Sequence, residues 1–175
     1  MPALRAAVRV PGIARIEADH PAAVPIDLWL TLSATCMDVQ SGIDEPLVTI
    51  ERAGTLRRLD VAALEDRLTR GFFDACRIAG RTPPARLVLR VSSQIPLSLG
   101  LGASAAATVA GALAANALLR LGLDDSAIAK LCGTIDGDAP AVAAVLSSEY
   151  VVQIRAECEP AIADRDVHTQ AVSVS

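Results

Sequence analysis

Aromatic residues and lysine are almost missing from this chain of 175 residues. Aromatic side chains make up 2% of the sequence, and Lys130 is the only lysine. Hydrophobic residues reach 52%, so the core must be built from Ala, Val, Leu and Ile, and the length suffices for one domain. The net charge is −4 and no basic run occurs, so we expect neither nucleic acid nor an anionic membrane surface as a partner.

The cysteines lack any grouping. Cys36, Cys76, Cys132 and Cys158 are widely spaced, without a CxxC motif or a Cys/His cluster. This spacing predicts neither a zinc site nor a disulfide framework. The N-terminus also lacks the apolar segment of a secretory signal peptide. We therefore expect a soluble protein of a reducing compartment, the cytoplasm.

Alternating apolar and polar residues predict several strands. A first strand is expected over residues 6–10, where Pro11-Gly12 stops it, and a second over residues 13–18. Further strands are predicted over residues 26–33, 47–52, 55–59, 87–91 and 150–154. Ala53-Gly54 is predicted to join the strands on either side of it as a hairpin.

Helical spacing predicts the remaining elements. Asp60 is expected to cap a helix that runs to Gly80, with one apolar face made of Val61, Leu64, Leu68, Phe72, Ala75, Cys76 and Ala79. A central helix is predicted over residues 103–121, a shorter one from Asp124 or Asp125 to about Cys132, and another over residues 140–146. This order predicts an α+β fold, with a mixed or antiparallel sheet and helices packed on one face. Residues 158–175 are expected to form a polar tail, or an edge strand near residues 171–174.

The stretch from residue 94 to 121 is a small-residue loop that leads directly into the central helix. Pro96 stiffens its entry, and Gly100 and Gly102 allow a tight turn. The first N–H groups of a helix have no intrahelical partner, and the helix dipole favours negative charge there. The stretch therefore predicts a phosphate-binding site.

Three other interpretations fit part of this stretch. Residues 95–119 carry no charge, as a transmembrane helix would, but Ala, Gly and Ser dominate them and Asn116 lies among them. Gly100-x-Gly102-x-x-Ala105 fits a loose dinucleotide fingerprint, but the preceding strand is predicted to end well before Gly100. A buried structural helix whose glycines only make a turn remains open. No Gly-Lys-Ser/Thr follows, which excludes a Walker A loop.

The loop resembles the phosphate-binding motif of the GHMP small-molecule kinases, and residues 109–116 are most similar to the homoserine kinase branch. The resemblance implies an ATP- and Mg²⁺-dependent kinase that phosphorylates a hydroxyl of a small, homoserine-like metabolite. It implies that Ser104 ligates Mg²⁺, while Ala103 stands in place of the family's other serine. The residues that would surround the ATP phosphates are Pro96, Gly100, Leu101, Gly102, Ala103, Ser104 and Ala105.

A second match lies at residues 136–142, which are similar to the homoserine kinase motif Glu-Gly-His-Pro-Asp-Asn-Val. By this resemblance Asp136 would be a metal ligand in place of the family's Glu. Asp138 replaces the His, and Pro140-Ala141 replace Asp-Asn, at positions near the acceptor and phosphate in relatives. Asp138 is therefore a substrate-site candidate. The alternative is that both aspartates are turn residues, which Asp-Gly-Asp favours.

A third, partial match covers residues 11–20, which resemble Pro-Gly-Arg-Val-Asn-Leu-x-Gly-Glu-His of galactokinase-like members. In those relatives the acid and the His lie near the acceptor, which makes Asp19 and His20 substrate-site candidates here. The alternative is a solvated loop before Pro21. No catalytic base can be named.

The resemblance ends before a second domain that family members carry. It implies a GHMP N-terminal domain over residues 1–157 and the absence of the C-terminal domain that closes the cleft. A fragment of a longer kinase, a subunit completed by a partner or by homodimerisation, and a protein recruited to another role are all consistent with this length. The second hypothesis is thus a degenerate GHMP-fold module that binds a small anionic ligand or a partner chain.

Overall fold

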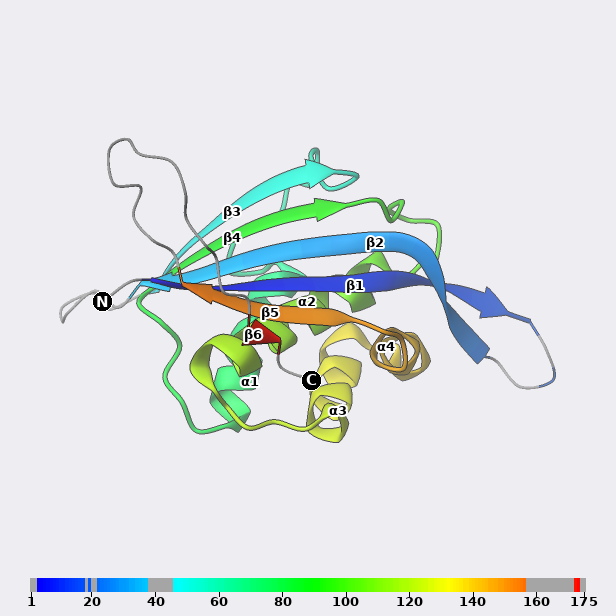
Figure 1. Cartoon of the computed structure of the whole chain (residues 1–175). Coiled ribbons are helices and arrows are strands. Elements are labelled where there is room, and N and C mark those ends of the chain that lie inside the picture. The colour runs from blue at the N-terminus through cyan, green and yellow to red at the C-terminus, as the bar shows by residue number, and fades with distance from the viewer. Residues whose placement is uncertain (1–2, 18, 20–21, 38–45, 157–171, 174–175) are drawn as a thin grey trace.

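The computed structural model describes residues 3–17, 19, 22–37, 46–156 and 172–173. These residues form one sheet with helices packed against it (Figure 1). The elements in chain order are β1 (Leu4–Ile16), β2 (Ala22–Met37), β3 (Leu47–Gly54), α1 (Arg67–Ile78), β4 (Arg86–Ser93), α2 (Ala103–Leu119), α3 (Asp125–Asp136), α4 (Ala139–Leu146), β5 (Val151–Ala156) and β6 (Val172–Ser173).

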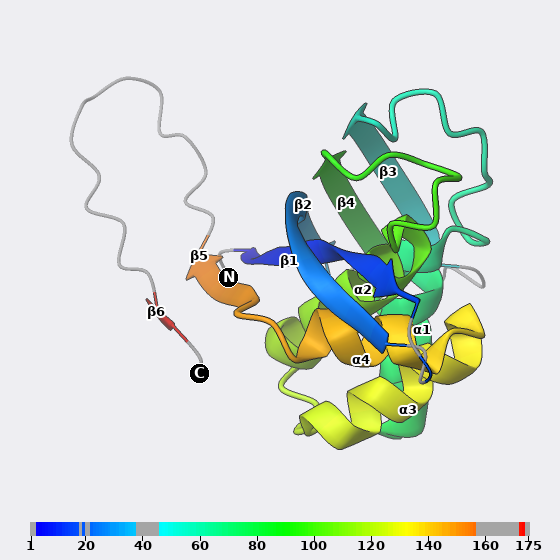
Figure 2. The ribbon, with the colours of Figure 1, turned by 90° about the vertical axis from the view of Figure 1, so that its right-hand side faces the viewer.

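The sheet has six strands in the order β3-β4-β2-β1-β5-β6. All its pairs are antiparallel except β3 with β4, which run parallel. Figures 1 and 2 show the described helices on one face of this sheet. The predicted α+β class with a mixed sheet and helices on one face is therefore confirmed.

The core between the sheet and the helices is aliphatic, as the composition requires. Helix α2 lies at its centre, where its small Ala and Gly residues let it pack against β1, β2 and the other three helices. Cys132 is buried in this core, and burial raises the pKa of its thiol to about 12. Among the described residues, no helix combines the length and the apolar character needed to cross a membrane.

The prediction that Pro11-Gly12 stops the first strand is wrong. β1 runs through both residues, and the register with β2 shifts between Pro11 and Ile13. A bulge tolerates a residue without an N–H and bends the strand locally. The strands predicted separately over residues 6–10 and 13–18 are thus one bulged strand, which ends at Ile16; residue 18 lies outside the described residues.

The predicted hairpin at Ala53-Gly54 is also wrong. β3 lies parallel to β4, and the chain after Gly54 turns across the end of β4. The Thr55 N–H donates to the carbonyl oxygen of Ser93 at 2.9 Å, and its hydroxyl donates to that of Ile95 at 2.7 Å. These bonds hold residues 55–59 in a turn at the entry to the glycine loop.

Helix α1 begins six residues later than predicted, with Asp66 rather than Asp60 as its N-cap. The Asp66 carboxylate accepts from the Leu68 N–H at 2.9 Å and pairs with Arg52 at 2.6 Å. Arg52 also donates to the carbonyl oxygen of Val61 at 3.1 Å. This buried pair holds the residues before Asp66 in turns, which an apolar periodicity alone cannot reveal.

The other helix ends differ less from the predictions. Helix α2 ends at Leu119 with Arg120 in the left-handed region, two residues short of the predicted end. Asp124 caps α3 as predicted, but α3 continues past Cys132 to Asp136. Gly137 then caps the end of α3, and Asp138 caps the start of α4.

Helices α1 and α2 meet at two glycines. A Cβ atom on Gly111 would lie 2.0 Å from the carbonyl oxygen of Leu68, and one on Gly71 would lie 2.2 Å from that of Thr108. Both obstacles are backbone atoms, so neither can rotate away. The two helices can pack this closely only because these positions lack side chains.

Gly111→Ala is therefore expected to lower the free energy of unfolding by about 1–3 kcal/mol, the usual range for overpacking. Urea denaturation followed by circular dichroism measures it. The matched control is Gly133→Ala in α3, where the new Cβ would make ordinary contacts with Ala139, to its Cβ at 3.4 Å and its Cα at 3.6 Å. That variant should be as stable as the original chain or more so, because Ala is the better helix former. Equal destabilisation of both variants would contradict the close-packing argument.

Candidate functional site

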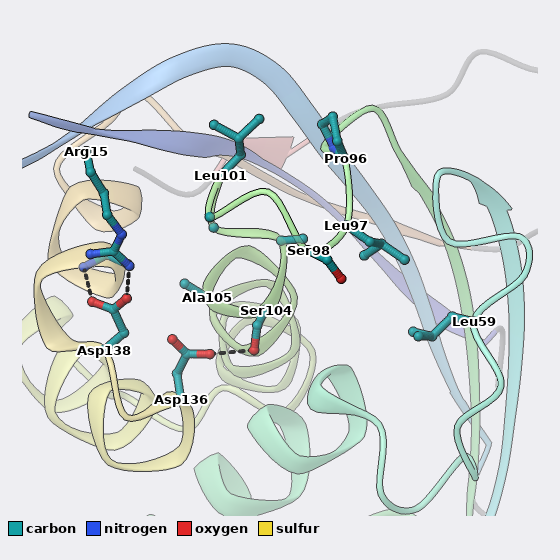
Figure 3. Close-up of a pocket in the computed structure, with 14 residues that line it drawn as sticks. Arg15, Leu59, Pro96, Leu97, Ser98, Leu101, Ser104, Ala105, Asp136 and Asp138 are labelled. Atoms are coloured by element: carbon teal, nitrogen blue, oxygen red, sulfur yellow. Dashed lines mark hydrogen bonds and ion pairs between the residues drawn. The ribbon is translucent and has the colours of Figure 1, made fainter.

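A cavity of about 320 Å³ lies where the glycine loop, the start of α2, β1 and the α3–α4 turn meet. Figure 3 shows its lining side chains, with the loop on one side and two aspartates on the other. The lining residues are Arg15, Leu59, Pro96, Leu97, Ser98, Gly100, Leu101, Gly102, Ala103, Ser104, Ala105, Asp136, Asp138 and Ala141.

The loop on one side of this cavity has every second residue in the left-handed region. Ser98 has a φ of 63°, Gly100 of 70° and Gly102 of 77°. Such alternation curls the backbone so that successive N–H groups converge, which makes a concavity suited to an anion. Glycine adopts this conformation freely, but for Ser98 it is strained.

The loop is anchored to the bulge in β1. The Ile13 N–H donates to the carbonyl oxygen of Leu101 at 2.9 Å. A Cβ on Gly12 would lie 2.8 Å from that same oxygen, and one on Gly102 would lie 2.6 Å from Cγ1 of Ile13. Both glycines are therefore required where the loop and β1 touch.

Helix α2 points its N-terminus into the cavity. Its first backbone bond runs from the Ala106 N–H to the carbonyl oxygen of Gly102, so the preceding helical N–H groups have no acceptor within the helix. Ser104 lies in this first turn with its side chain exposed, and its hydroxyl donates to the Asp136 carboxylate at 2.5 Å. Positive helix end, hydroxyl and carboxylate thus share one corner of the cavity.

Asp138 contributes a second carboxylate from the same turn. One of its oxygens accepts from the Ala141 N–H at 3.2 Å and so caps α4, and the other pairs with Arg15 of β1 (Figure 3). The Arg15 guanidinium is the main cause that holds the pKa of Asp138 below its ordinary value of 3.8. Partial burial opposes this shift, and the Ala141 N–H adds to it.

The structure brings together most of the residues that the sequence singled out. The seven loop positions from Pro96 to Ala105, Asp136 and Asp138 all line the cavity. Asp136 is the last residue of α3, and Asp138 lies between the two helices as the N-cap of α4, so the interpretation of both as turn residues holds only for Asp138. The metal-ligand role of Asp136 and the substrate role of Asp138 stay predictions. Asp19 is exposed in a bend beyond β1 and does not line the cavity, and His20 lies outside the described residues.

Sequence reasoning missed Arg15 and Ser98. Arg15 stands where the galactokinase-like motif over residues 11–20 has Asn. This departure from the motif could have identified Arg15 as a candidate site residue. The predicted strand end at Pro11-Gly12 prevented this assignment, because Arg15 reaches the cavity only if β1 continues through the bulge. Nothing in the sequence marks Ser98, since serine has no special preference for positive φ.

The oxygen donors of the cavity fit Mg²⁺ better than a softer metal. Mg²⁺ is usually held by one or two protein oxygens together with waters and substrate phosphates. Ser104 and Asp136 offer a hydroxyl and a carboxylate beside a helix end that favours phosphate. Within the described part of the chain, no group of three or more His, Cys, Asp or Glu side chains could hold a metal by itself.

The cavity lies largely within a segment that matches a known protein family. Residues 62–149, half of the chain, match the family described as GHMP kinases N terminal domain. The chain belongs to the GHMP kinase family. The matched segment contains the glycine loop, α2 and the α3–α4 turn, which together form most of the cavity of this GHMP domain.

Curated relatives of the domain are named homoserine kinases. The protein from Deinococcus radiodurans is 43% identical over 79 residues, which are 45% of this chain and 25% of that protein. The protein from Symbiobacterium thermophilum is 31% identical over 121 residues, which are 65% of this chain and 36% of that protein. The matches therefore span about a quarter to a third of the length of these relatives.

Solved structures share the fold. The mevalonate kinase of Methanococcus jannaschii superposes with a TM-score of 0.64 over 83% of this chain and 52% of its own, at 17% identity. The homoserine kinase of Cytophaga hutchinsonii superposes with a TM-score of 0.61 over 83% of this chain and 48% of its own, at 20% identity. These likenesses establish a GHMP architecture for the described elements.

The Arg15–Asp138 pair predicts a measurable titration. In Arg15→Gln the pKa of Asp138 should rise from its lowered value toward 3.8, as measured by carboxyl NMR. Because the folded-state pKa is lowered, the pair contributes stability above the unfolded pKa and loses it as pH falls through the folded pKa. The stabilities of the original chain and Arg15→Gln should therefore converge below that lowered pKa. An unchanged Asp138 pKa would contradict the pairing.

Proposed function

We propose that this domain binds MgATP in the cavity at the start of α2 and transfers a phosphoryl group to a hydroxyl of a small, homoserine-like metabolite. The observation that carries the proposal is the Ser104 hydroxyl 2.5 Å from the Asp136 carboxylate, at a helix N-terminus and beside a loop of alternating left-handed residues. Helix end and loop suit phosphate, and the two side chains suit a hard cation.

Phosphoryl transfer demands positioning and charge stabilisation more than covalent chemistry from the protein. Here the backbone N–H groups of residues 100–105 would hold the phosphates, and Ser104 and Asp136 would hold Mg²⁺. The bound cation would neutralise negative charge on the transferring group. The apolar side chains of Leu59, Leu97 and Leu101 line the same cavity and would limit water near the phosphates.

The acceptor assignment is supported by the curated relatives, which are named homoserine kinases. Asp138 lines the cavity from the turn after α3 and remains our substrate-site candidate within it. Asp19 and His20 stay candidates from the resemblance alone. A cytoplasmic setting, where ATP is plentiful, belongs to the same proposal.

Binding without transfer is the second candidate function. Both carboxylates that line the cavity are already engaged, Asp136 by Ser104 and Asp138 by Arg15. A general base must be able to take a proton from the acceptor hydroxyl, and an ion-paired carboxylate of lowered pKa is a weak base. On this alternative the domain holds a small anionic ligand, or gains its remaining groups from a second copy or a partner chain.

The test is an isothermal titration of MgATP into the purified chain and into Ser104→Ala. We expect the original chain to bind MgATP and Ser104→Ala to bind it about tenfold more weakly, since one oxygen ligand and one hydrogen bond are lost. Without Mg²⁺ the two proteins should bind ATP alike, because the hydroxyl would act mainly through the metal. Phosphorylation of L-homoserine, followed by ³¹P NMR, separates transfer from binding alone.

Ser126→Ala is the matched control for this titration. Ser126 is an exposed serine near the start of another helix, α3, and does not line the cavity. Its removal should leave MgATP affinity unchanged. No MgATP binding by the original chain would overturn the proposal, and binding without phosphorylated product would favour the second candidate.

A further inference from the structure

Among the described residues that line the cavity, the Arg15–Asp138 ion pair is the one charged feature that phosphate and Mg²⁺ binding do not use. Arg15 comes from β1, and Asp138 comes from the α3–α4 turn 123 residues later in the chain. Both line the cavity beside the Ser104–Asp136 corner (Figure 3). The pair therefore lies within reach of whatever ligand fills the space next to the phosphate loop.

The geometry of the pair leaves Arg15 able to bind a second partner. The Arg15 side chain retains 49% of its exposure, against 29% for Asp138. A guanidinium carries five N–H donors in a planar fork, and one carboxylate can occupy only one edge of it. The remaining donors can therefore serve an oxyanion that enters the cavity.

Asp138 is held more firmly than Arg15, which gives the two residues different roles. Its second oxygen is fixed by the Ala141 N–H at the start of α4. A carboxylate fixed in this way orients the guanidinium and reduces the rotamer freedom that Arg15 would lose on binding a ligand. Asp138 thus acts as a positioning residue, and Arg15 as the group that would touch the ligand.

We propose that Arg15 is a second oxyanion-binding group of this cavity, oriented by Asp138 and separate from the phosphate loop. This inference rests on the proposed function and adds to it. Arg15 would bind an anionic group of the ligand that the α2 N-terminus does not itself hold. Two sources offer that chemistry, the carboxylate of the acceptor and the terminal phosphate of the nucleotide. Charge-assisted bonds from arginine favour both.

Two affinity ratios test the inference and separate the sources. The first compares L-homoserine with 3-aminopropan-1-ol, which lacks only the carboxylate, in the presence of saturating MgADP. The second compares MgATP with MgADP. We expect Arg15→Gln to reduce at least one ratio about tenfold, the usual scale for one charge-assisted bond. A fall in the first identifies the acceptor carboxylate, and a fall in the second identifies the terminal phosphate.

Conservative variants separate binding from structure. Arg15→Lys keeps the charge without the fork and should restore part of the lost ratio. Asp138→Asn keeps a good helix cap but removes the ion pair, so it should reduce the same ratio by less than Arg15→Gln does. Arg90→Gln is the control, because Arg90 pairs with Glu51 on β3 and does not line the cavity. It should change neither ratio.

If both affinity ratios are unchanged in Arg15→Gln, the inference about Arg15 is overturned, and the proposal that the domain binds nucleotide is unaffected. If the original chain binds neither MgATP nor MgADP, the proposed function fails instead. The comparison of L-homoserine with 3-aminopropan-1-ol is then made without nucleotide. A carboxylate preference that disappears in Arg15→Gln would still support Arg15, and no preference in the original chain would overturn it.

Discussion

The hydrogen bond from the Ile13 N–H to the carbonyl oxygen of Leu101 fixes where the cavity forms. It joins the central part of the sheet to a loop that would otherwise be held only at its two ends. The bond requires close approach of two backbones, which explains why Gly12 and Gly102 face each other's segments without side chains. Once it is made, the start of α2 is directed at the α3–α4 turn, and Ser104 meets Asp136. The cavity is thus a consequence of a strand bulge as much as of a glycine loop.

Local patterns in the sequence predicted the fold class, because strands and helices carry their own periodicities. Asp124 and the glycine loop were found from short-range rules of capping and turn formation. The predictions that were wrong share a different cause. Asp66 replaced Asp60 as the cap because Arg52 pairs with it. The chain after β3 does not form a hairpin because Thr55 bonds to Ser93 at the end of β4 and to Ile95 beyond it. In each case a contact between distant parts of the chain decided between two locally acceptable conformations.

The same division applies to the cavity. The loop, Ser104 and Asp136 were predicted because they form contiguous motifs that resemble those of a known family. The strain at Ser98 could not be predicted, because it arises from the way the loop must curl between β4 and α2. Arg15 required two facts at once: that β1 continues through Pro11-Gly12, and that its outer end reaches the α3–α4 turn. Comparing a motif position by position reveals neither the continuation of β1 nor its contact with the α3–α4 turn.

The Arg15–Asp138 pair also changes what the departures from the family motifs mean. Arg15 stands in place of Asn in one motif, and Asp138 stands in place of His in another. Taken singly, each substitution resembles the decay of a site. An unpaired aspartate at the partly buried position 138 would cost free energy, so decay alone would be expected to leave a small or neutral residue there. A cation and an anion in contact instead satisfy each other, and Asp138 still caps α4. The two departures therefore support a site rebuilt around an ion pair, with an anion-binding group added beside the phosphate loop.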